Sequence, residues 1–103
     1  MNGENMITEI AVVQIVPGQE GDFEVAIGTA VSTVLSTCAG FLNFKLHKGI
    51  ESPSTYTFLI EWRNLEDHTV GFRESDLFVQ WRALIGKYFA APPSVEHWES
   101  IAI

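Results

Sequence analysis

His68 is the side chain in this sequence best suited to acid–base chemistry. It lies four residues before Phe72 in the stretch DHTVGF, and residues spaced by four share one side of a helix. An imidazole titrates near neutral pH, so His68 is a candidate general base beside an aromatic ring. The alternative is a hydrogen-bonded structural histidine, which is the more common role of a lone histidine.

The other two histidines, His47 and His97, have weaker claims to chemistry. No histidine lies two, three or four residues from another, so we expect no metal site built from neighbouring residues. We expect His97 to be a hydrogen-bonded surface or interface residue in the last strand. His47 lies near the end of a predicted strand and is either of the same kind or a hydrogen-bonding partner of a substrate.

An aromatic cluster accompanies His68, and it allows two interpretations. Its members are Trp62, Phe72, Phe78 and Trp81. Rings at these positions are most often hydrophobic core, yet a cleft between a sheet and its helices is also a common ligand site, mostly apolar with a few polar groups. The polar candidates are Asn43, His47, Glu61 and His68. A cleft of about 300 Å³ or more beside His68 would favour a binding site.

Local motifs for nucleotide, flavin or zinc binding are absent, so we expect no cofactor and no metal. The sequence has no GxGxxG, Walker loop, HExxH, CxxC or GxSxG. Its net charge is −7 and it has no basic run, which argues against nucleic acid and anionic membrane partners. Cys38 is the only cysteine, which excludes an internal disulfide and fits a reducing cytoplasm.

The length of 103 residues predicts one domain with a small margin of stability. Residues 1–6, MNGENM, lack the basic and apolar regions of a signal peptide, and we expect them to be a flexible tail before a single domain over residues 7–103. No apolar run approaches the roughly 18 residues that a membrane span needs.

The first half of the chain predicts a strand, a helix and a second strand. Residues 7–16 are rich in β-branched residues and apolar on both faces, and Pro17-Gly18 ends them. A helix follows from about residue 20 to Ala39-Gly40. Its apolar stripe is Phe23, Ile27, Ala30, Val31, Val34 and Cys38. Residues 41–49 then alternate as a strand.

The second half predicts a strand, a long helix and a last strand. Residues 55–62 complete a hairpin with residues 41–49, and LEDHTVGF is a short helical turn. Ser75 is a good N-cap for the long helix, whose apolar face continues to Phe89, and Pro92-Pro93 cannot continue it. SVEHWESI closes the chain as a strand.

The element order is therefore β-α-β-β-α-β, which belongs to the α+β class and is typical of a ferredoxin-like subunit. It gives an antiparallel four-stranded sheet with both helices on one face. The other face would carry Val13, Leu59 and Phe41 or its neighbours, which a monomer would expose as an apolar patch. We expect a homodimer in which two such sheet faces pack together.

Three stretches together resemble the antibiotic biosynthesis monooxygenase family over residues 7 to about 101. They are EIAVVQIVPGQEGDFEVAI, GFLNFKLHKGIESPSTYTFLIEWRN and FRESDLFVQWRALIGKYFAAPPSVEHWE. The likeness lies in the order and spacing of short features. These are Pro17-Gly18, Phe23, Gly40 with Phe44, Glu61 with Trp62, and Ser75 with Phe78.

The resemblance implies a dimeric α+β barrel of ferredoxin-like subunits. It also implies an activity, because several members oxygenate polycyclic phenols or quinols with molecular oxygen and neither metal nor flavin. In them the deprotonated substrate reduces oxygen directly. Such a protein supplies an apolar pocket, a base and hydrogen-bond donors for the developing oxyanion.

Two departures from the family patterns limit what is carried over. Many members have histidines where this chain has Phe72 and Leu77, so His68, one turn earlier, would have to supply the base. The haem-degrading members have an asparagine, a tryptophan and a histidine where this chain has Ala11, Phe72 and Arg82. The resemblance therefore does not extend to haem degradation.

Two functions and one structural alternative follow. The first is a cofactor-independent monooxygenase that oxidises a small aromatic quinol or polyphenol with molecular oxygen. In it His68 is the base, the four aromatic residues hold the ring, and Asn43 or His47 hydrogen-bonds a substrate oxygen. The second is a non-catalytic, dimeric ligand-binding or stress-response barrel. The third holds that side chains fill the pocket and leave no site.

Overall fold

The computed structural model describes residues 6–103, and the expected N-terminal tail lies, apart from Met6, outside them. The main elements are β1 (Ile7–Gln14), α1 (Glu20–Thr33), β2 (Phe41–Lys48), β3 (Thr55–Trp62), α2 (Asp76–Ile85) and β4 (Ser94–Glu99). Three short helices join them: η2 (Leu35–Thr37), η3 (Asp67–Phe72) and η4 (Gly86–Tyr88). The β-α-β-β-α-β order confirms the predicted fold class.

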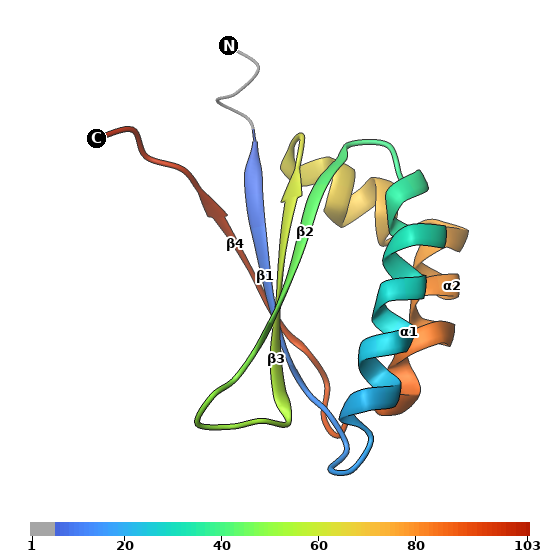
Figure 1. Cartoon of the computed structure of the whole chain (residues 1–103). Coiled ribbons are helices and arrows are strands. Elements are labelled where there is room, and N and C mark those ends of the chain that lie inside the picture. The colour runs from blue at the N-terminus through green and yellow to red at the C-terminus, as the bar shows by residue number, and fades with distance from the viewer. Residues whose placement is uncertain (1–5) are drawn as a thin grey trace.

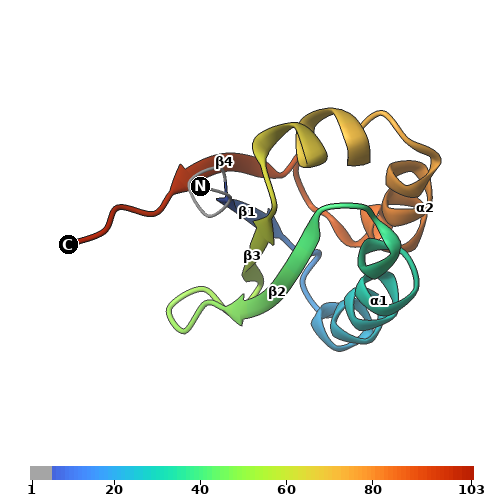
Figure 2. The same cartoon turned by 90° about the horizontal axis from the view of Figure 1, so that it is seen from above.

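The strands form one antiparallel sheet in the order β2-β3-β1-β4. Both long helices lie side by side on one face of this sheet and leave the other face uncovered (Figures 1 and 2). η3 lies on the helix side too, beyond the end of β3 (Figure 1).

Residues of β1 alternate between the two faces. Ala11 and Val13 face the helices and are buried, as is Ile15 directly after the strand, whereas Ile10 and Val12 are partly exposed on the open face. The prediction that Val13 lies on the open face is wrong, because the helices cover the face that Val13 shares with Ala11.

The first residues of β2 depart from simple alternation. The register of β2 against β3 shifts between Phe41 and Asn43, as in a β-bulge. Phe41 therefore packs edge-on against the buried Trp62, with ring centroids 6.2 Å apart. The prediction named Phe41 or its neighbours on the open face. Phe41 itself does not lie there, but its neighbour Asn43, opposite Glu61, does. Leu59 lies there as expected, between the buried residues Phe58 and Ile60.

The long helices follow their predicted apolar stripes but are shorter than expected. α1 ends at Thr33, and η2 replaces its last turn. Ser32 and Thr33 donate hydrogen bonds from their hydroxyls to the Thr29 carbonyl, a local bond that weakens helix propagation. Ser75 caps α2 as predicted, since its hydroxyl accepts a hydrogen bond from the Leu77 amide at 3.2 Å.

η3 is fixed at the end of β3 by a short polar network. The Arg63 guanidinium donates to the Asp67 carboxylate at 2.8 Å, and the Asp67 amide donates to the Asn64 side chain at 2.8 Å. Gly40 has a φ of +87°, and a Cβ there would overlap the Asp67 carboxylate. Glycine at position 40 is therefore required both by the turn and by the close approach of η3.

None of the helices in residues 6–103 is long and apolar enough to cross a membrane. The cytoplasmic location stays a prediction from the sequence.

Candidate active site

η3 holds His68 in the interior of the protein. It is a π-helix, in which the Arg73 amide donates to the carbonyl of His68, five residues earlier, at 3.0 Å. Turns of this kind are frequent at functional sites. His68 and Phe72 are both buried, and their rings lie nearly parallel with centroids 6.3 Å apart. The predicted placement of these two side chains on one face of a short helix is confirmed.

Glu9 lies beside His68 and is the buried carboxyl group of the site. β1 turns it toward the helices, and only 5% of its surface is exposed. Its Oε1 accepts a hydrogen bond from Trp62 Nε1 at 2.9 Å and lies 3.2 Å from His68 Nε2. Burial raises the pKa of Glu9 to about 7, although the Trp62 donor and the positive charge of Arg73 act in the opposite direction.

His97 continues this row of polar groups toward the surface. β4 pairs with β1 so that His97 lies opposite Glu9, and His97 Nε2 is 2.8 Å from His68 Nδ1. His97 is exposed, so the predicted hydrogen-bonded surface histidine is confirmed. Burial lowers the pKa of His68 to about 4, with smaller effects from Arg73 and His97. His68 is therefore neutral at pH 7, and its contact with Glu9 is a hydrogen bond rather than an ion pair.

The Glu9–His68–His97 row has two consistent arrangements of protons. With Glu9 ionised, His68 Nε2–H donates to the carboxylate and Nδ1 accepts from His97. With Glu9 protonated, the carboxyl donates to Nε2, and Nδ1–H donates to His97. Both ring nitrogens of His68 are occupied in either case, whereas Glu9 Oε2 has no hydrogen-bond partner among residues 6–103.

The same geometry does not form a metal site. The two nitrogens of His68 point to different partners, so the three side chains do not converge on one point. Within residues 6–103 there is no group of three or more histidine, cysteine, aspartate or glutamate side chains that could hold a metal ion.

A cavity of about 240 Å³ opens beside Glu9 and His68, between the sheet, η3 and α2. Besides these two residues it is lined by Ala11, Val13, Phe58, Ile60, Phe72, Arg73, Phe78, Trp81, Arg82, Phe89, Pro93 and Val95. It is smaller than the value of about 300 Å³ set as the expectation for a binding site, so that expectation is not met. Side chains nevertheless leave this space open, and an apolar cavity of about 150 Å³ is enough for benzene. The space therefore suits one or two aromatic rings.

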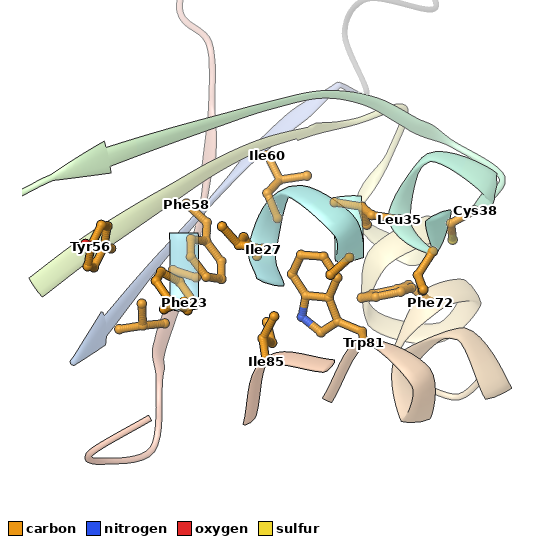
Figure 3. Close-up of a cluster of buried hydrophobic side chains, with 14 of the residues drawn as sticks. Phe23, Ile27, Leu35, Cys38, Tyr56, Phe58, Ile60, Phe72, Trp81 and Ile85 are labelled. Carbon is orange, nitrogen blue, oxygen red and sulfur yellow. The ribbon is translucent and has the colours of Figure 1, made fainter. Parts of the chain in front are cut away.

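Three of the four predicted aromatic residues line this cavity: Phe72, Phe78 and Trp81. The Phe72 ring lies 5.5 Å from Phe78 and 5.9 Å from Trp81, and Figure 3 shows Phe72 and Trp81 adjacent within the core. Trp62 is fully buried behind Glu9 and serves as its hydrogen-bond donor rather than as a wall. The cluster is thus both core and cavity wall.

Three predicted polar residues lie away from the cavity. Asn43 pairs with Glu61 and His47 pairs with Thr57, all on the open face of the sheet. The neighbours of Glu61 in β3, Ile60 and Trp62, are the residues that face the helices. The structure therefore does not bring Asn43, His47 or Glu61 to His68.

Sequence inspection missed Glu9, Arg73, Arg82 and His97 as members of the site. For Glu9 the sequence did carry a signal. It lies two and four positions before Ala11 and Val13, so the three side chains share one face of β1. A charged residue at a core position of a strand is rarely tolerated without a partner. Folding alone brings Arg73 and Arg82 to the cavity. It also brings His97 into contact with His68, outside the cavity lining.

Comparison with known proteins identifies the family. The sequence profile of the antibiotic biosynthesis monooxygenase family matches residues 6–84. The chain belongs to this family. The chain is also similar over nearly its whole length to the uncharacterised protein YczJ of Bacillus subtilis (strain 168). The two are 36% identical over 96 residues, which are 93% of this chain and 100% of YczJ.

Solved structures of the antibiotic biosynthesis monooxygenase family share the fold. A crystal structure of a protein assigned to the family from Bordetella bronchiseptica is 38% identical, with a TM-score of 0.89 over 95% of this chain and 99% of that one. SnoaB, a cofactor-independent oxygenase from Streptomyces nogalater, superposes with a TM-score of 0.79 over 96% of each chain. At 10% identity, the likeness to SnoaB shows the fold alone.

Proposed function

We propose that this protein is a cofactor-independent monooxygenase that oxidises a small quinol or polyphenol with molecular oxygen. The observation that carries the proposal is a buried carboxyl group, Glu9, which is hydrogen-bonded to His68 and faces an aromatic cavity. Membership of the antibiotic biosynthesis monooxygenase family supports the reaction class.

Glu9 and His68 act together as the base in this proposal. A substrate ring lies between the aromatic walls, and its hydroxyl reaches Glu9 Oε2. Glu9 has a pKa of about 7, which matches proton abstraction near neutral pH. His68 positions the carboxylate by donating from Nε2 and stays neutral. The predicted base is thereby extended from His68 alone to the pair.

The reaction is balanced without an added reductant. The substrate anion transfers electrons to O₂ and forms a C–O bond, and the resulting peroxide takes up the proton from Glu9. The O–O bond then breaks with loss of water. One quinol and one O₂ give one hydroxyquinone and one water, so the substrate supplies all the electrons.

Oxygen uptake with a panel of one-ring and two-ring hydroquinones tests this proposal. We expect turnover that rises with pH through about 7, and Glu9→Gln should lower it by about 10²-fold or more, as expected for loss of a general base. Glu61→Gln is the matched control, because it makes the same change on the open face. If Glu9→Gln turns over as fast as the parent, the assignment of the base is wrong.

A second candidate is the non-catalytic ligand-binding barrel, which the same cavity favours equally. In that case the hydroquinones bind and change the tryptophan fluorescence, because Trp81 lines the cavity, but no oxygen is consumed. Binding without oxygen uptake across the whole panel would establish this second function in place of the first.

The proposal includes a homodimer formed through the open face of the sheet. Ile10, Val12 and Leu59 lie on this face. Trp98 of β4 pairs with Thr8 of β1, so it lies on the same face, and it is 54% exposed. Covering such a patch in a second copy would remove apolar surface from water. Sedimentation should give a dimer at micromolar concentration, and Trp98→Glu should shift it toward monomer. A monomeric parent protein would contradict this part of the proposal.

A further inference from the structure

Two arginines line the cavity of a strongly acidic protein. The chain has six lysines and arginines against thirteen aspartates and glutamates. Arg73, which directly follows η3, and Arg82 of α2 both line the cavity. One third of the basic side chains is therefore gathered at a single site of a chain with a net charge of −7.

Neither arginine is neutralised by a carboxylate within the described part of the chain. The ion pairs there use Lys48 with Glu24 and Arg63 with Asp67. The positive charge of Arg73 lowers the pKa values of Glu9, His68 and His97, so it lies close to that row, but no carboxylate oxygen comes within ion-pair distance of it. Burial outweighs its effect on Glu9, whose pKa is raised, so Arg73 is not the counter-ion of Glu9.

Arg82 is held at the cavity by aromatic rings. Its guanidinium lies 6.0 Å from the Phe78 ring centroid and 5.7 Å from that of Phe89, and both rings line the cavity. Stacking on rings fixes the plane of a guanidinium while leaving its N–H groups available. A guanidinium presented in this way suits recognition of a planar carboxylate by two parallel hydrogen bonds.

We propose that the cavity binds a phenol or quinol that carries a carboxylate, which Arg73 and Arg82 hold while the hydroxyl meets Glu9. The cavity volume of about 240 Å³ limits such a ligand to one or two rings with a short acidic substituent. Without local positive charge, a chain of this net charge would repel such an anion. As a statement about substrate class the inference rests on the proposed function, but as a statement about binding it stands alone.

Calorimetric titration with two ligands of nearly the same shape tests the inference. At pH 7.5 the parent should bind 4-hydroxybenzoate at least 10-fold more tightly than 4-hydroxybenzamide, since only the first is an anion. Arg73→Gln and Arg82→Gln should each weaken 4-hydroxybenzoate binding by about 10-fold, the loss expected for a charge-assisted hydrogen bond, and leave amide binding unchanged. Raising the salt concentration should weaken binding of the acid alone.

Lys87→Gln is the matched control. Lys87 lies close to Arg82 in sequence but packs over the Tyr88 ring, 5.3 Å from its centroid, and does not line the cavity. It should change neither affinity, which separates a local effect from the change in net charge. Both arginines are exposed, so the variants should unfold at nearly the parent temperature, and this check excludes misfolding.

The outcomes separate this inference from the proposed function. Equal parent affinity for the acid and the amide, or an unchanged preference in the Arg73→Gln/Arg82→Gln double variant, overturns the inference. Arginine-dependent binding of the acid without oxygen uptake by any quinol supports the inference and removes the oxygenase. Oxygen uptake with neutral quinols at the same kcat/KM as with their carboxylated counterparts supports the oxygenase and removes the inference.

Discussion

The two ends of the interface between sheet and helices place glutamates in opposite environments. Near the start of α1, Glu20 lies at the surface, where Ser54 donates a hydrogen bond to it at 2.6 Å and lowers its pKa. Glu24 likewise accepts from the Tyr56 hydroxyl at 2.5 Å. Near η3, Glu9 is buried beside His68, and its pKa is raised to about 7.

This difference separates glutamates that stabilise the fold from Glu9, for which we propose a function. At the α1 end, the Ser54 hydroxyl favours the ionised form of Glu20, and the core beneath is closed around Phe23. At the η3 end, loss of water destabilises the ionised form of Glu9, and the core opens into a cavity. Ionised Glu20 therefore contributes stability, whereas ionised Glu9 destabilises the folded protein. A destabilising group that faces a cavity is a candidate for catalysis.

The largest effect on stability should come from the closed end. Phe23 is fully buried and packs against Tyr56 and Phe58, with ring centroids 4.9 and 6.2 Å away. Phe23→Ala should lower the free energy of unfolding by about 3–5 kcal/mol, because it removes buried surface and leaves a void. Val25→Ala, on the exposed side of α1, is the control and should change little. Urea denaturation measures the free energy of unfolding of both variants. Equal losses would contradict the assignment of Phe23 to a closed, tightly packed core.

Glu9→Gln should reverse part of the pH dependence of stability. Between its unfolded pKa of 4.5 and its folded pKa of about 7, the unfolded chain ionises first, so the contribution of Glu9 to stability falls as pH rises. Glutamine cannot ionise. The variant should therefore gain about 3 kcal/mol relative to the parent between pH 4.5 and pH 8. His68, His97 and Arg73 face Glu9 in both proteins.

Urea denaturation at those two pH values measures the gain, and Glu61→Gln is again the control. The comparison of the parent with Glu9→Gln removes the opposite effect of His68, whose lowered pKa makes stability rise with pH between about 4 and 6.5. A stability difference between parent and variant that does not change with pH would mean that folding does not raise the pKa of Glu9.

Trp62→Phe should raise the pKa of Glu9 further above 7. The Trp62 N–H favours the ionised carboxylate, and phenylalanine keeps most of the ring but has no donor. Above that pKa the variant should lose about 1–3 kcal/mol of stability, the typical result of leaving a buried acceptor unpaired. Titration of the glutamate carboxyl carbons by NMR measures the shift. Trp81 donates no hydrogen bond to Glu9, so Trp81→Phe should leave the pKa of Glu9 unchanged.

The smallest effect should come from Glu20→Gln, and its sign should be opposite to that of Glu9. The pKa of Glu20 is lowered, chiefly by the Ser54 hydroxyl, so its contribution is present above pH 4.5 and is lost as pH falls. The side chain lies at the surface and is only partly buried, so we expect a difference close to the error of urea denaturation at pH 7, which vanishes in acid. A difference that grows as pH falls would break the comparison between the two ends.

Several local features could be predicted from sequence because they depend on neighbours along the chain. The strand over residues 55–62 and the shared face of His68 and Phe72 follow from periods of two and about four residues. The helix cap at Ser75 follows from the residue type just before the apolar pattern begins. The placement of Phe41 failed because a bulge changes the register, and a bulge depends on the partner strand. Asn43 and His47 were misplaced relative to the cavity for a related reason, since alternation fixes two faces but does not say which one the helices cover.

What the sequence by itself determined was the element order, the family and the presence of a buried aromatic cluster around His68. These follow from apolar periodicity and short-range spacing, which depend only on the order of residues along the chain. Only the tertiary structure decided that Glu9 from β1 and the two arginines line one cavity with His68. It also decided that His97 from β4 hydrogen-bonds to His68. Antiparallel pairing places Glu9 opposite His97, although residue numbers 9 and 97 are 88 positions apart in the sequence. Burial, which sets the pKa of Glu9, exists only once those strands and η3 have closed around it.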